Sequence, residues 1–233
     1  MQKSLPLYRK QPQYMGKEYL PRLLLTGFGS FGPVTSNPSE RLILHFRANA
    51  PGDILLETMV LPVSYSNGAE PVVRLLYDAE LERRPFFAVL MLGVAAGSEV
   101  WRLERYGRNF RGDRRDSDGY SPEAGPLISG APDCLSSSLP IESLYNRLCD
   151  KKIPAAISDS AGDYLCNALL FTVLNALSNC GSLAKAGFIH VPADKDTAAP
   201  NFGVPLFSFP FSMQITAVET ALDVLCESYY GEN

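Results

Sequence analysis

The stretch AAISDSAGDYLCNALLFTVLNALSN, residues 155–179, joins a short apolar run to a long one through a turn. The run at 155–158 has the length of a buried strand, and the small residues at 160–162 are typical of a tight turn. The pattern over 163–179 is too long for a strand and predicts a helix. Because a strand followed closely by a helix is the building unit of α/β folds, this stretch predicts that class.

Strand and helix patterns alternate along the rest of the chain. Four more apolar runs predict strands, at 22–26, 54–60, 86–93 and 187–191. Helical patterns occur at 38–48, 67–82, 141–151 and 213–229. Most of the runs are continuous rather than alternating, which is typical of strands covered on both faces. The sequence therefore predicts a three-layer α/β/α sandwich around a largely parallel, twisted sheet.

A chain of 233 residues is within the range of one domain, and we expect a single α/β domain over residues 21–233. Residues 1–20 are polar and contain proline, without an apolar core of signal-peptide length, so they predict a flexible tail. Residues 109–139 are rich in Gly, Pro, Ser and Asp. That composition predicts a long loop or a peripheral hairpin.

The charge balance limits the partners of the protein. The net charge of -4 argues against a nucleic-acid surface, which would need a clustered basic excess. The one basic cluster, at 102–115, is interrupted by acidic residues and predicts a mixed-charge segment. The longest apolar stretch, at 165–177, contains Asn167 and Asn175 and is too short to cross a bilayer. We therefore expect neither a nucleic acid nor a membrane as partner.

Five cysteines are spread over the chain, and no two form a CxxC pair: Cys134, Cys149, Cys166, Cys180 and Cys226. Without such a pair a structural zinc site is not expected, and we predict no metal and no cofactor. An odd number of cysteines cannot pair completely within one chain. Free thiols are typical of a reducing compartment, so the composition predicts a cytoplasmic protein.

Cys166 stands apart because it lies in the first turn of a predicted helix. The unpaired N–H groups and positive dipole end of a helix N-terminus stabilise a thiolate. The same N–H groups could hold the oxyanion that forms when a carbonyl is attacked. The alternative is a buried cysteine that packs as a small hydrophobic side chain on an apolar helix. From the residues alone both interpretations stay open.

A nucleophilic cysteine needs a base, and the chain has two histidines. His45 lies within an amphipathic helix pattern, where an exposed or packed side chain is expected. His190 ends an apolar strand, at the edge of the sheet where α/β sites form, so His190 is the candidate base, although a structural histidine is the alternative. A third group should orient the imidazole. Many carboxylates are available, and Glu104 lies among charges, where a solvated face is the usual explanation.

Several segments, in order and spacing, resemble the pyroglutamyl-peptidase family of cysteine peptidases, also called pyrrolidone-carboxylate peptidases. The most specific are SDSAGDYLCN at 158–167, with its SAGxxxCN pattern, and AGFIHVP at 186–192. The supporting pieces are LLLTGFGSFGPVTSNPS at 23–39, LPVSY at 61–65, GVAAG at 93–97, LERYGRN at 103–109 and SLPIESLYNRL at 138–148. Together they cover nearly the whole chain after about residue 22.

The resemblance implies a peptidase domain over residues 21–233 that removes an N-terminal pyroglutamyl residue from peptides. It implies that Cys166 is the nucleophile, His190 the base and Glu104 the third member of the triad. Arg114 falls ten residues after the glutamate, where family members place an arginine thought to help hold the oxyanion, although the surrounding loop matches poorly. The partners implied are peptides with N-terminal pyroglutamate, and a homo-oligomer is allowed.

The family binds the pyroglutamyl ring between aromatic side chains, and the resemblance assigns Phe28 and Phe31 to that role. Tyr164 replaces a usual phenylalanine, and Asn37 matches an asparagine of the family's NPS piece. A flat neutral lactam suits an apolar slot with a few hydrogen bonds. One departure is Val94, where family members often have Gln or Leu followed by a Gly-Gly-Arg run.

Two rival functions follow from the same residues. The spacing of Gly27, Gly29 and Gly32 after a strand matches a dinucleotide fingerprint, but the next helix is predicted only near Pro38, so no helix N-terminus would receive a pyrophosphate. The second rival is a relative with altered specificity or weak activity that binds another small lactam-like or peptide ligand. The change at Val94 leaves that alternative open.

Overall fold

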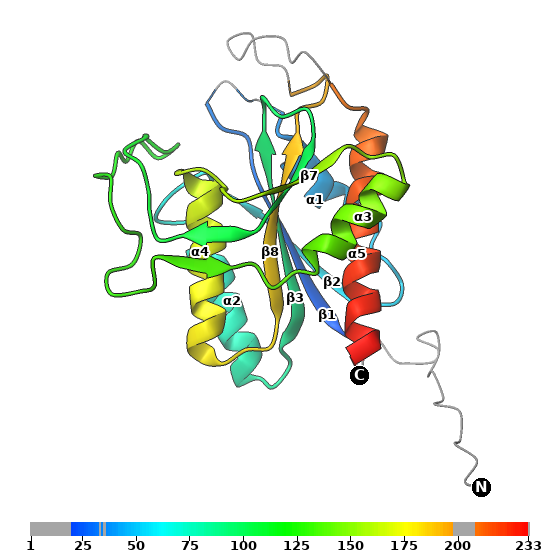
Figure 1. The fold of residues 1–233 in the computed structure, drawn as a ribbon. Helices are drawn as coiled ribbons and strands as arrows, with labels where there is room; N and C mark the ends of the chain where they lie inside the picture. The colour runs from blue at the N-terminus through cyan, green and yellow to red at the C-terminus, as the bar shows by residue number, and fades with distance from the viewer. Residues whose placement is uncertain (1–19, 33, 35, 198–207, 233) are drawn as a thin grey trace, which may run out of the picture.

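The structure is a computed structural model that describes residues 20–32, 34, 36–197 and 208–232. The expected tail at 1–20 lies almost entirely outside these residues. The described chain forms three layers, with helices over both faces of a central sheet (Figure 1). One face carries α2 (Glu70–Leu81) and α4 (Leu165–Cys180). The other face carries α1 (Pro38–Ala48), α3 (Ile141–Asp150) and α5 (Phe211–Glu232).

The central sheet has the strand order β2-β1-β3-β8-β4-β7. Its strands are β1 (Arg22–Phe28), β2 (Leu55–Leu61), β3 (Phe86–Ala95), β4 (Trp101–Glu104), β7 (Ala155–Ser158) and β8 (Lys185–Pro192). β1, β2, β3 and β8 run parallel to one another, whereas β4 is antiparallel to β8 and parallel to β7. The predicted α/β sandwich and largely parallel sheet are therefore confirmed, with β4 and β7 running opposite to the other four strands.

The continuous apolar runs are explained by burial on both faces of the sheet. Successive side chains of a strand point to opposite faces. In β1, Leu23 and Leu25 pack with α1 and α5 on one face, and Leu24 packs with α2 and α4 on the other. All three are fully buried. A strand covered in this way needs apolar residues at every position.

The helices lie within a few residues of their predicted bounds. α1 begins at Pro38 because the Asn37 side chain caps it, with Asn37 Oδ1 accepting from the Ser39 N–H at 3.0 Å. α4 ends at Cys180 because Gly181 adopts a left-handed conformation with φ of 66°. Among the described helices none is long and apolar enough to cross a membrane.

Three strands were missed by the sequence patterns: β4, β5 (Tyr106–Arg108) and β6 (Cys134–Ser136). β5 and β6 pair antiparallel, and β6 lies near the end of the segment at 109–139. Of the two forms predicted for this segment, a long loop or a peripheral hairpin, the pairing fits the hairpin. The solvated mixed-charge interpretation is wrong for β4. Glu104 is only 1% exposed there, because β4 lies inside the sheet and the side chains of Arg102 and His190 contact the carboxylate.

Candidate active site

A pocket of about 320 Å³ opens where β1, β3 and β8 end. Carboxyl ends of parallel strands meet at one edge of a sheet, and ligand sites of α/β folds gather there. The pocket is lined by eight of the nine residues predicted from sequence: Phe28, Phe31, Asn37, Val94, Arg114, Tyr164, Cys166 and His190. The ninth, Glu104, lies behind His190.

Cys166 occupies the first turn of α4, as predicted. The N-cap residue of the helix, Tyr164, is extended, with φ of -114° and ψ of -159°, and its side chain forms no cap hydrogen bond. The first N–H groups of a helix have no partner within the helix, so those at Leu165, Cys166 and Asn167 can serve a ligand. The thiol is half-buried and lines the pocket. This is the setting of an anion site beside a thiol.

The route by which Cys166 reaches His190 differs from the one expected. β7 runs opposite to β8, so its carboxyl end does not lie at the edge where β8 ends. Residues 159–164 return the chain across the sheet to the start of α4. Gly93 leaves room for the Cys166 sulfur and the Phe188 ring: a Cβ there would lie 3.0 Å from Cys166 Sγ and 2.6 Å from Phe188 Cζ. Any side chain at position 93 would displace the sulfur or the ring.

His190 is held between a carboxylate and the thiol. Its Nδ1 lies 2.7 Å from Glu104 Oε1. The Cys166 thiol lines the same pocket and acts electrostatically on the imidazole. Because Glu104 takes Nδ1, the other ring nitrogen, Nε2, is left for the thiol. Both His190 and Glu104 are buried, at 6% and 1% exposure.

The surroundings of His190 favour its protonated form. Burial lowers the pKa of His190, but the Cys166 sulfur and then the Glu104 carboxylate raise it, and the net effect is a pKa raised from 6.5 to about 9. An imidazolium beside the sulfur stabilises a thiolate. Cys226 is the opposite case, because its burial on α5 raises the pKa of its thiol to about 12.

The outer wall of the pocket carries the predicted Arg114. Its guanidinium carbon lies 3.9 Å from the centre of the Tyr164 ring, and the Tyr164 hydroxyl donates to the Arg115 carbonyl at 2.9 Å. The nearest carboxylate is Asp163, at 3.9 Å from the Arg114 guanidinium in an exposed pair. Arg114 thus lies over the aromatic side of the pocket, on the long segment between β5 and β6.

Asn167 holds this segment to the helix that carries Cys166, a role that the sequence patterns did not reveal. Its side chain is fully buried. Asn167 Oδ1 accepts from the Arg108 N–H at 2.9 Å, and Nδ2 donates to the carbonyls of Arg108 and Phe110 at 2.8 Å each. A polar amide inside the apolar run at 165–177 was the available signal, because such a group needs buried partners.

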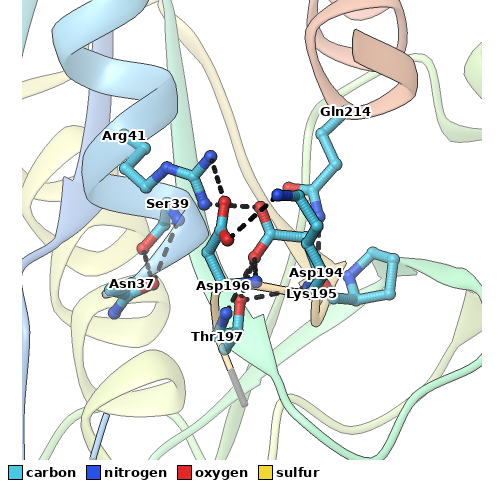
Figure 2. Close-up of polar contacts among 9 residues, drawn as sticks. Asn37, Ser39, Arg41, Asp194, Lys195, Asp196, Thr197 and Gln214 are labelled. Carbon is cyan, nitrogen blue, oxygen red and sulfur yellow. Dashed lines mark hydrogen bonds and ion pairs between the residues drawn. The ribbon is translucent and has the colours of Figure 1, made fainter. Parts of the chain in front are cut away.

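A second missed network fixes the chain just after β8. Figure 2 shows Arg41 reaching from α1 to Asp194 and Asp196. The fully buried Asp194 accepts from Arg41 Nη1 at 2.6 Å and from the Thr197 N–H and hydroxyl at 2.9 and 2.6 Å. These bonds tie the segment that follows His190 to the helix whose cap, Asn37, lines the pocket.

The glycine-rich loop after β1 does not have the geometry of a dinucleotide site. α1 begins only at Pro38, and its first turn is occupied by the Asn37 cap. Gly27 meets α1 directly, since a Cβ there would lie 2.7 Å from the Ser39 carbonyl oxygen. The glycine therefore serves the packing of strand against helix, and the N-terminus of α1 is not free for a pyrophosphate.

A thiol at a helix start, beside a buried imidazole that is bonded to a carboxylate, is a combination of groups that cysteine hydrolases use. The family model described as pyroglutamyl peptidase matches residues 21–228. The chain therefore belongs to the pyroglutamyl peptidase family, which is a family of cysteine peptidases.

Individual relatives agree with this assignment. A pyrrolidone-carboxylate peptidase of Thermococcus onnurineus is 37% identical over 172 residues, which cover 73% of this chain and 83% of that protein. Another, of Halalkalibacterium halodurans, is 32% identical over 206 residues, covering 88% and 97%. The solved structure of pyrrolidone carboxyl peptidase from Thermococcus litoralis matches with a TM-score of 0.83 at 31% identity, covering 92% of this chain and 97% of that one.

Proposed function

We propose that this protein hydrolyses the bond after an N-terminal pyroglutamyl residue of peptides. The observation that carries the proposal is the buried hydrogen bond between Glu104 and His190, with Cys166 and His190 lining one pocket that has an apolar side. Membership of the pyroglutamyl peptidase family supports the substrate class.

The reaction follows from the positions of the three groups. The Cys166 thiolate attacks the pyroglutamyl carbonyl carbon, and the oxygen becomes an oxyanion that the first N–H groups of α4 can hold. The imidazolium of His190 then gives its proton to the leaving amine as the C–N bond breaks, which leaves a thioester on Cys166. His190, now neutral, takes a proton from water, and the resulting hydroxide releases pyroglutamate and restores the thiolate. Glu104 keeps the imidazole oriented throughout.

The aromatic side of the pocket supports recognition of the ring. Phe28 ends β1 and Phe31 follows it, and Tyr164 lines the same pocket from the start of α4. An apolar slot of this kind accepts a flat, neutral lactam and disfavours the charged α-amino group of an ordinary N-terminus, whose burial would cost more. Arg114 lies over this wall, and we assign it to contact with the oxyanion.

A direct assay tests the function. We expect hydrolysis of a fluorogenic pyroglutamyl amide and none of a panel of ordinary aminoacyl amides, with Cys166→Ala as the inactive control. Chelators should leave the rate unchanged, because no step uses a metal. Equal cleavage of the aminoacyl amides would instead support the altered-specificity alternative, which Val94 in the pocket wall favours.

Three further proposals concern the whole protein. We infer a cytoplasmic enzyme, since all five cysteines are free thiols. We also infer that residues 21–233 fold as one peptidase domain, which limited proteolysis would test. A homo-oligomer would be detected by size-exclusion chromatography with light scattering.

A further inference from the structure

Arg102 lies next to the reactive groups although no motif marks it. It is two residues from Glu104 on β4, so the two side chains point to the same face of the sheet. In the antiparallel pair of β4 with β8, Arg102 is directly opposite His190. Trp101 and Leu103 pack on the other face, with α3 and α5. Because side chains alternate between the two faces along β4, the Arg102 guanidinium and the Glu104 carboxylate lie on the face that carries α4. The His190 imidazole of β8 lies on the same face.

The Arg102 guanidinium contacts both the carboxylate and the chain that leads to Cys166. Its Nε lies 3.4 Å from Glu104 Oε1. Its Nη2 donates to Ser158 Oγ at 2.8 Å and to the Ser160 carbonyl at 2.7 Å. One side chain therefore connects β4 with the end of β7 and the crossing segment before α4.

The carboxylate needs such a partner. The Glu104 side chain is fully buried, and its Oε2 has no hydrogen-bond partner among the described residues. In the described part of the chain, its ion-pair partners are His190 and Arg102, both at Oε1. A buried carboxylate with few bonds is costly, and its orientation depends strongly on the partners it has.

We propose that Arg102 is a positioning residue of this active site, which holds Glu104 toward His190 and ties it to the segment that carries Cys166. Arg102 touches no substrate, and acts through Glu104 and the Ser160 carbonyl. The inference rests on the proposed function for its kinetic readout.

The kinetic test compares Arg102→Met with a matched control, Arg22→Met. Arg22 also binds a carboxylate, Glu57, at 2.8 Å and the Arg84 carbonyl, but at the amino end of β1, away from the pocket. Arg102→Met should lower kcat about tenfold or more, up to the hundredfold that a displacement of about 1 Å can cause, with KM within about twofold. Arg22→Met should leave kcat per folded enzyme unchanged. Equal kcat in the two variants, or a change in KM alone, would overturn the proposal.

A double variant tests whether Arg102 acts through the carboxylate. In a Glu104→Gln background, Arg102→Met should lower kcat by much less than it does in the wild type, because residues that act as a unit are not additive. Full additivity would contradict the route through Glu104. If Arg102→Met does not fold, Arg102→Lys serves in its place. It keeps the charge but cannot span both contacts, so a kcat equal to that of the wild type would count against the proposal.

A substrate-free readout separates this inference from the proposed function. Alkylation of Cys166 by iodoacetamide, followed by mass spectrometry at neutral pH, reports the thiolate that His190 stabilises. We expect it to slow several-fold in Arg102→Met and to stay unchanged in Arg22→Met. A wild type that alkylates rapidly at Cys166 but hydrolyses no pyroglutamyl amide would contradict the function and leave the role of Arg102 standing. Unchanged alkylation in Arg102→Met would refute the role itself.

Discussion

The two sides of the pocket are built from different kinds of contact. On one side, Glu104 and His190 are buried and hydrogen-bonded to each other, and the Cys166 sulfur acts on the same imidazole. On the other, Phe28 and Tyr164 offer apolar surface and make no bond to those groups among the interactions described. Polar groups in a bonded series depend on one another, whereas apolar contacts contribute separately. Changes on the first side should therefore reduce kcat strongly, and changes on the second should alter KM moderately.

The largest effect is expected at the nucleophile. Cys166→Ala removes the reacting atom and little volume, so hydrolysis should fall by about four orders of magnitude or more while the melting temperature stays nearly unchanged. Steady-state assays with a fluorogenic pyroglutamyl amide and thermal unfolding measure the two. Alanine at the other cysteines should affect stability at most. A stable and active Cys166→Ala enzyme would end the proposed mechanism.

Limiting iodoacetamide offers a second measurement on the same residue. Cys134 and Cys149 are exposed, whereas Cys166 is half-buried. Exposure alone would label the first two, but thiolate character decides reactivity. We expect mass spectrometry to find Cys166 modified first, and earlier labelling of Cys134 or Cys149 would argue against an activated thiol.

Next in size is the loss of the base. His190→Ala should be nearly as damaging as Cys166→Ala, because members of one catalytic unit are not additive. His45→Ala is the control, since His45 lies on α1 with its ring against Phe46 at 5.1 Å between centroids. The comparison uses kcat/KM of both variants. An essential His45 with a dispensable His190 would reverse the assignment.

Glu104 should matter less, because it orients the base and does not react. Glu104→Gln should be roughly two orders of magnitude less damaging than His190→Ala, as orienting carboxylates are in comparable triads. It should also move the pH profile. The pKa of His190 is raised to about 9 by Cys166 and Glu104 against the lowering effect of burial.

The sign of the pH effect follows from the protonated form of His190. The imidazolium is present below its pKa and gives the proton to the leaving amine, so kcat should fall as pH rises through about 9. Without the Glu104 charge the pKa of His190 falls. The alkaline limb of the kcat–pH profile of Glu104→Gln should therefore move to lower pH. A limb that stays in place would show that the carboxylate does not act on the imidazole.

The reacting side could be predicted from sequence only in part. Cys166 and His190 are marked by local patterns, a helix start and a strand end, which short-range physics determines. Glu104 is not, because its burial depends on pairing of the four-residue β4 with strands β7 and β8, which follow far along the chain. The reversed direction of β7 was missed for the same reason.

The hydrogen bonds and ion pairs that support the site could not be predicted from the sequence either. Arg41 and Asp194 are separated by 153 residues, and neither lies in a pattern that marks a buried ion pair. The three layers, in contrast, could be predicted from the apolar runs in β1, β3 and β8, because strands that are covered on both faces need apolar residues at successive positions. Apolar runs therefore predicted the layers, whereas the polar network depends on tertiary contacts that no local pattern marks.

The smallest effect is expected at Val94, on the side that binds by contact. Val94 lines the pocket where β3 ends, beside Val191 of β8, and its side chain can neither donate nor accept a hydrogen bond. A pyroglutamyl ring carries an amide N–H and a lactam carbonyl, and leaving one of these unpaired when buried costs about 1–3 kcal/mol, roughly 5- to 150-fold in affinity. Val94→Gln should recover part of this affinity and lower KM for pyroglutamyl amides, while kcat and the alkylation rate of Cys166 stay unchanged. Val100→Gln, a half-buried valine outside the pocket lining, is the matched control and should leave KM as it is. If Val94→Gln alters neither KM nor kcat, position 94 does not contact the ring, and the apolar side of the pocket must bind its substrate through Phe28, Phe31 and Tyr164 alone.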